Sequence, residues 1–223
     1  MPPPLSTDLT AYLNSKSLTP TTAWLSTFLS TQRPNIPPAA LRQTALFRLL
    51  ASNITETLQP GPGSVFPRDI HDAAVPERRL QGPVVVQVVD VADIGRSRWA
   101  QVEALEALER GEGVRGREIV RVVPGETDGE GGEERWKGPH KLTLQDARGM
   151  CVYGVEVEGI EGVGMGMAMG VKMVLKDIVV ARGVILLDPR GAAMLGGRME
   201  GLHKVWKEDL KERLKGETQR GGD

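Results

Sequence analysis

The sequence predicts a mainly β protein, in which a small five-stranded barrel follows a group of helices and precedes a C-terminal helix. Three observations carry this prediction. Up to position 58, apolar residues recur three and four positions apart, which is typical of amphipathic helices. Residues 83–187 instead contain short β-branched and alternating runs, which are typical of strands. Residues 92–140 form a long insertion after the first of these runs, where a hairpin would need about two to five residues.

The composition is that of an ordinary globular protein. The chain has 223 residues, of which 40% are hydrophobic and 26% charged, and its net charge of −1 gives no strong field toward nucleic acid or membrane. The single cysteine, Cys151, excludes an internal disulfide, and its place in a predicted strand favours a buried small side chain. We find no secretory signal and no uninterrupted apolar span, so a reducing compartment, nucleus or cytosol, is expected.

Residues 1–62 are predicted to form a small bundle of three helices. A short first helix covers Thr7 to Leu13. Thr19-Pro20 predicts the start of a second helix, with Trp24 and Phe28 on its apolar face. Pro37-Pro38 predicts the start of a third helix, whose apolar stripe continues to Ile54. Such a bundle is too small to be stable alone, so we expect it to pack on a neighbour.

Residues 63–82 are predicted to be an extended, polar linker, and residues 83–197 a β domain. The five expected strands are Val84–Val91, Lys141–Gln145, Met150–Glu158, Val171–Lys176 and Ile178–Leu187. Because no crossover helix of adequate length lies between them, we expect a barrel of the oligonucleotide/oligosaccharide-binding (OB) type. Residues 198–223 are predicted to be a C-terminal helix and tail, since apolar residues recur helically from Met199 to Lys215.

The insertion, at about residues 93–139, has two halves of different character. The first half carries a helical apolar stripe, made of Ile94, Trp99, Val102, Leu105 and Leu108. The second half, Gly125 to Gly138, is rich in Gly and Glu around one aromatic residue, Trp136, and Ile119 to Val123 has the pattern of an edge strand. We interpret the insertion as an arm that reaches into a partner. In the alternative interpretation, Trp99 and Leu105 pack back on the barrel.

No catalytic, cofactor or metal site is expected. The glycines from Gly162 to Gly170 resemble a phosphate-binding loop, but a strand follows them where a helix would be needed, so a connector is the better interpretation. The three histidines, His71, His140 and His203, have no spacing that would hold a metal. A small-molecule substrate is therefore not expected.

Autonomous binding of single-stranded nucleic acid is the alternative function, because it is common among barrels of this type. It needs a basic groove with exposed aromatic side chains. The predicted strands contain no aromatic residue besides Tyr153, and the outer half of the insertion is acidic. These observations favour a protein-binding barrel.

From about Trp24 to about Lys207 the chain resembles the RecQ-mediated genome instability protein 1 family, in a fungal form. The resemblance is carried by Val86 to Gly95, by Leu142 to Asp146, and by Gly183 to Pro189, which Met194-Leu195-Gly196-Gly197 follows. No single motif is as specific as a zinc signature, but their order, with a long insertion after the first strand, is specific. Animal members have a second, C-terminal OB domain that we do not expect here.

The resemblance implies a non-catalytic nuclear subunit of a complex that acts in DNA repair, recombination and replication. Its implied partners are topoisomerase III, a type IA enzyme on which the helical region and the OB barrel would dock, and a RecQ-family helicase, and it would meet DNA mainly through them. The resemblance also implies that the complex dissolves double Holliday junctions, and that the insertion enters the topoisomerase gate, favours its open form and promotes decatenation. The candidate partner-binding residues are Ile94, Trp99, Val102, Leu105, Ile119, Val120, Trp136, Leu195, Gly196 and Gly197.

Overall fold

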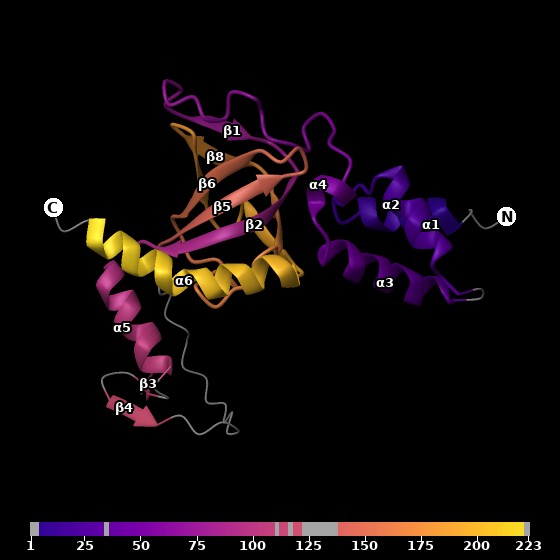
Figure 1. Ribbon diagram of the computed structural model, residues 1–223. Coiled ribbons are helices and arrows are strands. Elements are labelled where there is room, and N and C mark those ends of the chain that lie inside the picture. The colour runs from indigo at the N-terminus through magenta and orange to yellow at the C-terminus, as the bar shows by residue number, and fades with distance from the viewer. Residues whose placement is uncertain (1–4, 34–35, 110–111, 116–117, 122–137, 221–223) are drawn as a thin grey trace.

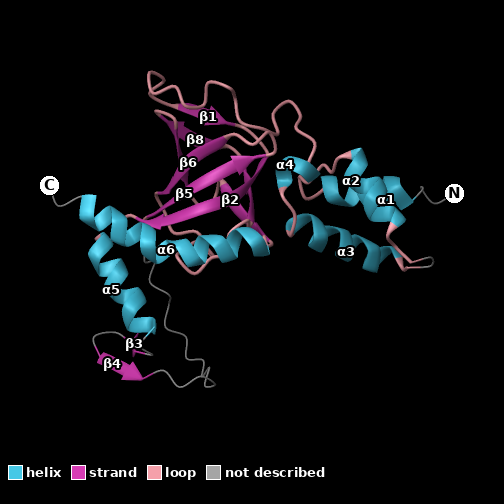
Figure 2. Cartoon of the chain, in the orientation of Figure 1, coloured by secondary structure: helices cyan, strands magenta, loops and turns pink. Residues whose placement is uncertain are grey.

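The computed structural model describes residues 5–33, 36–109, 112–115, 118–121 and 138–220, with the backbone alone at 108–109, 112–115, 118–121 and 217–220. Within these residues, four helices form an N-terminal helical unit beside a curled β-sheet (Figure 1). A long C-terminal helix runs beneath the sheet, and the insertion projects from the sheet on the side away from the helical unit (Figures 1 and 2). This order of elements agrees with the predicted architecture.

The helical unit consists of α1 (Leu5–Asn14), α2 (Thr22–Ser30), α3 (Pro38–Leu50) and the short α4 (Ile54–Thr57). The proline pair starts α3 as predicted, with Pro37 as its cap and Pro38 at the first helical position. The predicted start of α2 at Thr19-Pro20 is wrong. Backbone hydrogen bonds from Thr21 to Thr57 (2.8 Å) and from Gln59 to Thr19 (2.9 Å) hold this segment extended, so Thr21 caps the helix instead.

The helical unit packs against the barrel, as its size requires. Its core residues include Leu13, Phe28 and Leu49, and Val85 and Ala147 of the barrel belong to the same cluster. Ile54, which we assigned to the third helix, instead begins α4 and is fully buried in this cluster. The bundle therefore gains its stabilising apolar area from the sheet as well as from its own helices.

The barrel is one sheet of eight strands in the order β1-β8-β9-β6-β5-β2-β7-β10. The strands are β1 (Arg78–Leu80), β2 (Val84–Asp93), β5 (His140–Asp146), β6 (Cys151–Glu156), β7 (Lys172–Leu175), β8 (Ile178–Ala181), β9 (Val184–Leu187) and β10 (Ala192–Gly196). β7 and β8 lie toward opposite ends of this order, yet only Lys176 and Asp177 separate them in the chain. The sheet therefore curls until they meet, as in a partly open OB barrel whose five strands are β2, β5, β6, β7–β8 and β9.

β2 explains the β-branched run that opened the β domain. Val84, Val86 and Val88 face the barrel core, whereas Val85 faces the helical unit, so both sides of this half of the strand are buried. A register shift between Val88 and Asp90 marks a bulge, beyond which exposure alternates. The bulge therefore separates the half of β2 that is buried on both sides from the half that leads to the insertion.

Four predictions for the β domain need correction. The predicted strand Ile178–Leu187 is two strands, because Arg182 and Gly183 have φ angles of 47° and 82°, a pair of positive values that makes a two-residue hairpin turn. β1 lies inside the predicted linker and β10 follows the predicted end of the sheet; both are edge strands. Cys151 is exposed, not buried, because it begins β6 on the outer side.

The Gly/Met segment connects β6 to β7, as predicted, and is anchored by its methionines. Met167 and Met169 are buried in the barrel core. The backbone of Gly170 donates a hydrogen bond of 2.7 Å to the Val88 carbonyl. The segment is therefore a packed cover over one end of the barrel.

The insertion contains α5 (Arg98–Glu109) and a hairpin of β3 (Glu112–Arg115) and β4 (Glu118–Arg121). The helix begins later than the apolar stripe predicts, because β2 continues to Asp93 and a turn follows. β4 covers part of the predicted edge strand, but it pairs with β3 and not with the barrel. The C-terminal helix, α6 (Glu200–Arg220), buries Trp206 and Leu214 as its amphipathic pattern predicts.

Candidate protein-binding site

The base of the insertion is clamped by Asp93, the last residue of β2. Its side chain is fully buried and accepts hydrogen bonds from the backbone of Gly95 (2.9 Å) and of Arg96 (3.1 Å). The Arg96 side chain adds an ion pair of 2.5 Å. Because a buried carboxylate is costly unless its oxygens are satisfied, this geometry holds the turn in one conformation.

The two ends of the insertion are held together at the same place. The backbone of Ile94 donates a hydrogen bond of 3.0 Å to the Pro139 carbonyl. A side-chain carbon on Gly95 would lie 3.1 Å from the Gly138 carbonyl oxygen, a tight contact that a larger residue could make only if Gly138 moved slightly. Next to them, His140 and Glu156 form a buried pair with a separation of 2.5 Å. The insertion therefore leaves the barrel from a closed, ordered base.

α5 is fixed to this base through Gln101. The Gln101 side-chain amide is buried and donates to the carbonyl oxygens of Asp93 and Arg96, both at 2.9 Å. Arg98 also donates to the Asp93 carbonyl, at 3.1 Å. The direction of α5 is thus set within its first turn.

α6 supports α5 from the side. Glu106 of α5 lies 3.7 Å from the ammonium group of Lys211 and 2.8 Å from that of Lys215. α6 is itself attached to β2, because the indole nitrogen of Trp206 donates to Asp90 at 2.6 Å and Arg213 approaches the same oxygen at 3.3 Å. The half-exposed ion pairs each contribute little, whereas the buried Trp206 contributes most of the attachment.

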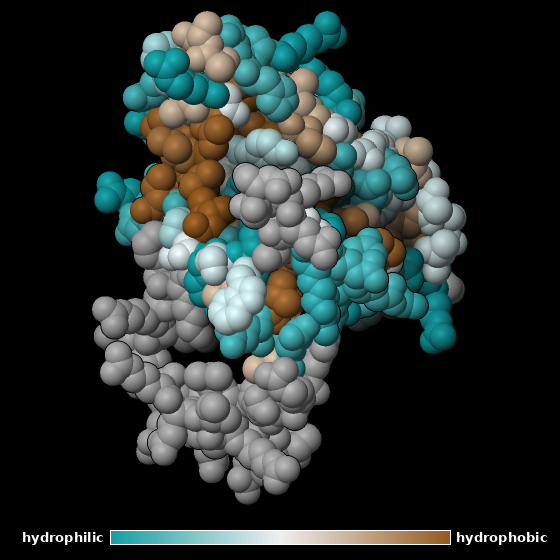
Figure 3. Space-filling model, turned by 60° about the vertical axis from the view of Figure 1, so that its left-hand side comes forward, coloured by the Kyte–Doolittle hydropathy of each residue, from teal (hydrophilic) through white to brown (hydrophobic). Residues whose placement is uncertain are grey.

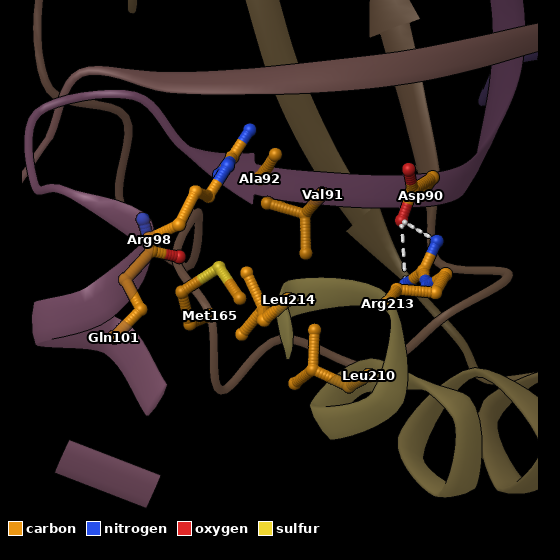
Figure 4. A pocket seen from close by; sticks show the side chains of 9 residues that line it. All are labelled: Asp90, Val91, Ala92, Arg98, Gln101, Met165, Leu210, Arg213 and Leu214. Carbon is orange, nitrogen blue, oxygen red and sulfur yellow. Dashed lines mark hydrogen bonds and ion pairs between the residues drawn. The ribbon is translucent and has the colours of Figure 1, made fainter. Parts of the chain in front are cut away.

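A small pocket lies between β2, α5 and α6 (Figure 4). Leu210, Leu214 and Met165 make its apolar wall, and Asp90 and Arg213 lie together at one side. Its volume of about 30 Å³ is enough for a water molecule and not for a cofactor. The Oε1 atom of Gln101 is buried without a hydrogen-bond partner among the described residues. The pocket is a packing feature of the arm and not a ligand site.

The structure gives the candidate residues of the insertion different surroundings. Ile94 and Trp99 are 43% and 63% exposed, and Val102 and Leu105 are half-buried. The backbone of Ile119 and Val120 lies in β4, but their side chains, like all of Trp136, lie outside the described residues. Among the described residues of α5, Trp99 is therefore the large hydrophobic side chain that is exposed to solvent.

The candidate residues of β10 lie elsewhere. Leu195 packs against the helical unit's core, and a side-chain carbon on Gly197 would lie 2.3 Å from the Leu50 carbonyl oxygen. Gly196, between them, has open space on its side-chain face. The structure thus brings Leu195 and Gly197 against the helical unit and not together with Ile94 and Trp99.

Sequence reasoning missed the polar residues that hold the arm, Asp93 and Gln101. A signal was present for Asp93, because an aspartate two residues before a glycine is typical of a turn closed by the side chain. For Gln101 there was none, because its partners are backbone carbonyls that only the folded chain brings within reach.

The described residues contain no group of three His, Cys, Asp or Glu side chains that could hold a metal ion. No helix among them is both long and apolar enough to span a membrane. Burial lowers the pKa of Lys172 to about 8, but its ammonium group donates to the Gly170 carbonyl at 2.6 Å and does not line the pocket of Figure 4.

Comparisons with known proteins identify both parts of the fold. Residues 66–210 match a family model described as "RMI1, N-terminal OB-fold domain", and residues 13–57 match "RMI1, N-terminal helical domain". The chain is 30% identical over 192 residues to RecQ-mediated genome instability protein 1 of Schizosaccharomyces pombe (strain 972 / ATCC 24843). The matched region covers 78% of this chain and 80% of that protein. The chain is also 25% identical over 167 residues to the Mus musculus protein of the same name, and here the matched region covers 74% of this chain and 25% of that protein.

Proposed function

Because the chain belongs to the RecQ-mediated genome instability protein 1 family, we propose that it is a non-catalytic subunit that binds topoisomerase III, a type IA enzyme. In this proposal the complex also contains a RecQ-family helicase, acts in the nucleus and dissolves double Holliday junctions. The chain meets DNA mainly through its partners.

One observation supports this proposal most: the arm is held at its base and yet presents an apolar side chain to solvent. Asp93, Gln101 and α6 fix α5, while Trp99 remains 63% exposed. A large aromatic side chain at a fixed position is typical of a binding hot spot, because little conformational entropy is lost when a partner covers it.

The arm promotes decatenation by favouring the open topoisomerase gate. A binding protein shifts a two-state equilibrium only by the difference between its affinities for the two states. Each additional 1.4 kcal/mol or so of contact with the open gate, relative to the closed gate, raises the open-to-closed ratio about tenfold. The apolar residues of the insertion supply these contacts.

Removal of the distal insertion tests this function. Deletion of residues 113–138 removes the distal insertion, including Gly138 at its base, but spares every strand of the barrel. The barrel should therefore fold, while binding of topoisomerase III weakens and stimulation of decatenation is lost. In a second variant, a Gly/Ser segment of equal length replaces these residues, so that the chain keeps its length and loses only the side chains. The comparison shows whether the side chains or the length of the insertion matter. Unchanged binding and decatenation in both variants would contradict the proposal for this arm.

Autonomous binding of single-stranded nucleic acid is the second candidate, and one contact favours it. Lys141 lies 4.8 Å from the centre of the exposed Tyr153 ring, so a cation and an aromatic face meet on the outer side of β5 and β6. Fluorescence anisotropy with an oligonucleotide and the isolated chain measures this activity. A sub-micromolar, salt-sensitive affinity would favour the second candidate over the first.

A further inference from the structure

The outer side of three barrel strands forms an apolar surface. Along β6 and just beyond it, Val152, Gly154 and Glu156 point inward, so Tyr153, Val155 and Val157 point outward. By the same alternation, Val184 and Leu186 of β9 and Val179 of β8 point outward. Tyr153 and Val157 are 54% and 53% exposed, and the other four are half-buried. We call these six residues the outer face.

The strand register makes the outer face contiguous. Val155 pairs with Leu186, which pairs with Val179, so the three lie in one row across three strands. Figure 3 shows hydrophobic residues gathered on one side of the barrel, at the left of that view. No outward-pointing residue of β5, β6, β8 or β9 is acidic, and Lys141 lies at the edge of the row, opposite Val155.

The outer face continues into the base of the insertion. Since Lys141 pairs with Val155 in antiparallel strands, Pro139 lies opposite Val157, and Ile94 is hydrogen-bonded to Pro139. Ile94 is therefore in the next row on the same side, where it is 43% exposed. Four of the seven large hydrophobic residues that are exposed among the described residues, Ile94, Trp99, Tyr153 and Val157, thus belong to the outer face or to the adjoining arm.

The size of the outer face indicates what covers it. With strands about 4.8 Å apart and rows about 6.7 Å apart, the surface from β5 to β8 measures roughly 14 Å by 13 Å. That is about the width of one α-helix. It is well below the roughly 800 Å² per protein that a stable interface buries, so the outer face does not hold a separate partner or a second copy by itself. It must be one part of a larger interface, and the arm is the part beside it.

We infer that the partner which receives the insertion also covers the outer face, with an apolar protein surface about one helix wide. This inference rests on the proposed function and adds the side of the barrel that meets the topoisomerase. The arm and the outer face then act as one continuous docking surface, from Trp99 through Ile94 to Val157 and Tyr153.

Charged substitutions on the outer face test this inference. Tyr153→Glu and Val157→Glu replace side chains that are more than half exposed, so the fold should be retained, which a thermal unfolding curve verifies. With purified full-length topoisomerase III, the double variant should bind at least about tenfold more weakly than the unchanged chain. The matched control is Val205→Glu on α6, which is 56% exposed and should bind within about twofold.

The outcomes separate the inference from the function on which it rests. If the unchanged chain fails to bind topoisomerase III, the proposed function is lost and the inference with it. If the unchanged chain binds and the double variant binds equally well, the inference alone is overturned. The inference is also overturned if sedimentation shows a dimer that the double variant dissociates, or if the variant loses only oligonucleotide binding.

Discussion

At the scale of single residues, two buried charged side chains differ in how well their charge is compensated by neighbouring groups. The Asp93 carboxylate is buried with two backbone donors and an arginine, so its charge is compensated. The Lys172 ammonium group is fully buried with one carbonyl partner, at Gly170. Its burial therefore disfavours the charged form, which is why its pKa is lowered to about 8.

Lys172 makes stability depend on pH. Its pKa is lower in the folded chain than the usual 10.5, so between about pH 8 and 10.5 the unfolded chain binds more protons and stability rises with pH. Lys172→Met removes a buried charge but also a hydrogen bond, and it should raise the free energy of unfolding at pH 7 by about 1–2 kcal/mol. This advantage should shrink by pH 10, as urea unfolding of both proteins measures.

The control for this prediction is the exposed lysine Lys176. Lys176→Met should change the free energy of unfolding by less than about 0.5 kcal/mol at either pH. A Lys172→Met advantage that does not vary with pH would show that packing, and not the charge, causes it.

At the scale of elements, α6 works as a support that joins the arm to the barrel. Its buried Trp206 and Leu214 face the barrel, and its Lys211 and Lys215 face Glu106 of α5. The ion pairs are partly exposed and weak, so the helix depends on Trp206 for its position. Loss of that side chain should therefore affect the arm as well as the barrel.

Two substitutions of Trp206 separate packing from hydrogen bonding. Trp206→Ala should lower the free energy of unfolding by about 3–5 kcal/mol, because it leaves a cavity. Trp206→Phe retains most of the buried area but leaves Asp90 without the indole donor, and it should cost about 1.5–3 kcal/mol. Hydrogen exchange should show faster opening of α5 in both variants.

The neighbouring Val205 provides the control, since it is 56% exposed on the same helix. Val205→Ala should change stability by less than about 0.5 kcal/mol and leave exchange in α5 unchanged. Equal losses in the Phe and Ala variants would mean that the hydrogen bond, and not the burial, holds α6.

At the scale of the whole molecule, the helical unit and the barrel share a core and a polar network. Gln87 of β2 is buried and accepts a hydrogen bond from the backbone of Ile54 at 3.1 Å. Its amide nitrogen donates to Asn53 and Gln145, both at 2.8 Å. Together with the shared apolar cluster, these bonds fix α4 on the sheet, so the two parts should unfold together.

At Gly197 the two parts approach each other closely. Gly197→Ala adds a carbon 2.3 Å from the Leu50 carbonyl at a φ of 93°, so both a clash and backbone strain result. Gly196→Ala has a similar φ of 86° but open space. We expect Gly196→Ala to cost about 1–2 kcal/mol of unfolding free energy and Gly197→Ala about 1–3 kcal/mol more.

Urea unfolding measures this difference, and limited proteolysis between the two parts reports whether the contact has loosened. Faster cleavage near residues 59–64 is expected in Gly197→Ala alone. Equal stability of the two variants would show that Leu50 yields without cost, and that the contact is less rigid than its geometry indicates.

Patterns within the chain predicted the elements that depend on local chemistry. The proline pair before α3, the alternation of β6 and the stripe of α6 each come from neighbouring residues, and each was found. The turn at Arg182-Gly183 escaped prediction because the apolar run continues through it. β1 escaped because Arg78 and Arg79 have no strand pattern of their own and become a strand only by pairing with β8.

Of the candidate site, only the exposed apolar residues could be identified from the sequence. Trp99 was identified from helical spacing, but the clamp at Asp93 and the packing of Leu195 against the helical unit depend on residues far apart in sequence. The outer face was missed for the same reason, since the row from Val155 to Val179 exists only in the register of three strands.

The closed base of the arm has a consequence for how this protein can change over generations. Where a loop's two ends are already tied together by Ile94 and Pro139, adding residues beyond them leaves the barrel's own pairing untouched. In polymer terms, doubling the length of a flexible loop costs only about 0.6 kcal/mol. Lineages can therefore lengthen, shorten or rewrite the distal arm, while the scaffold that carries it remains the same.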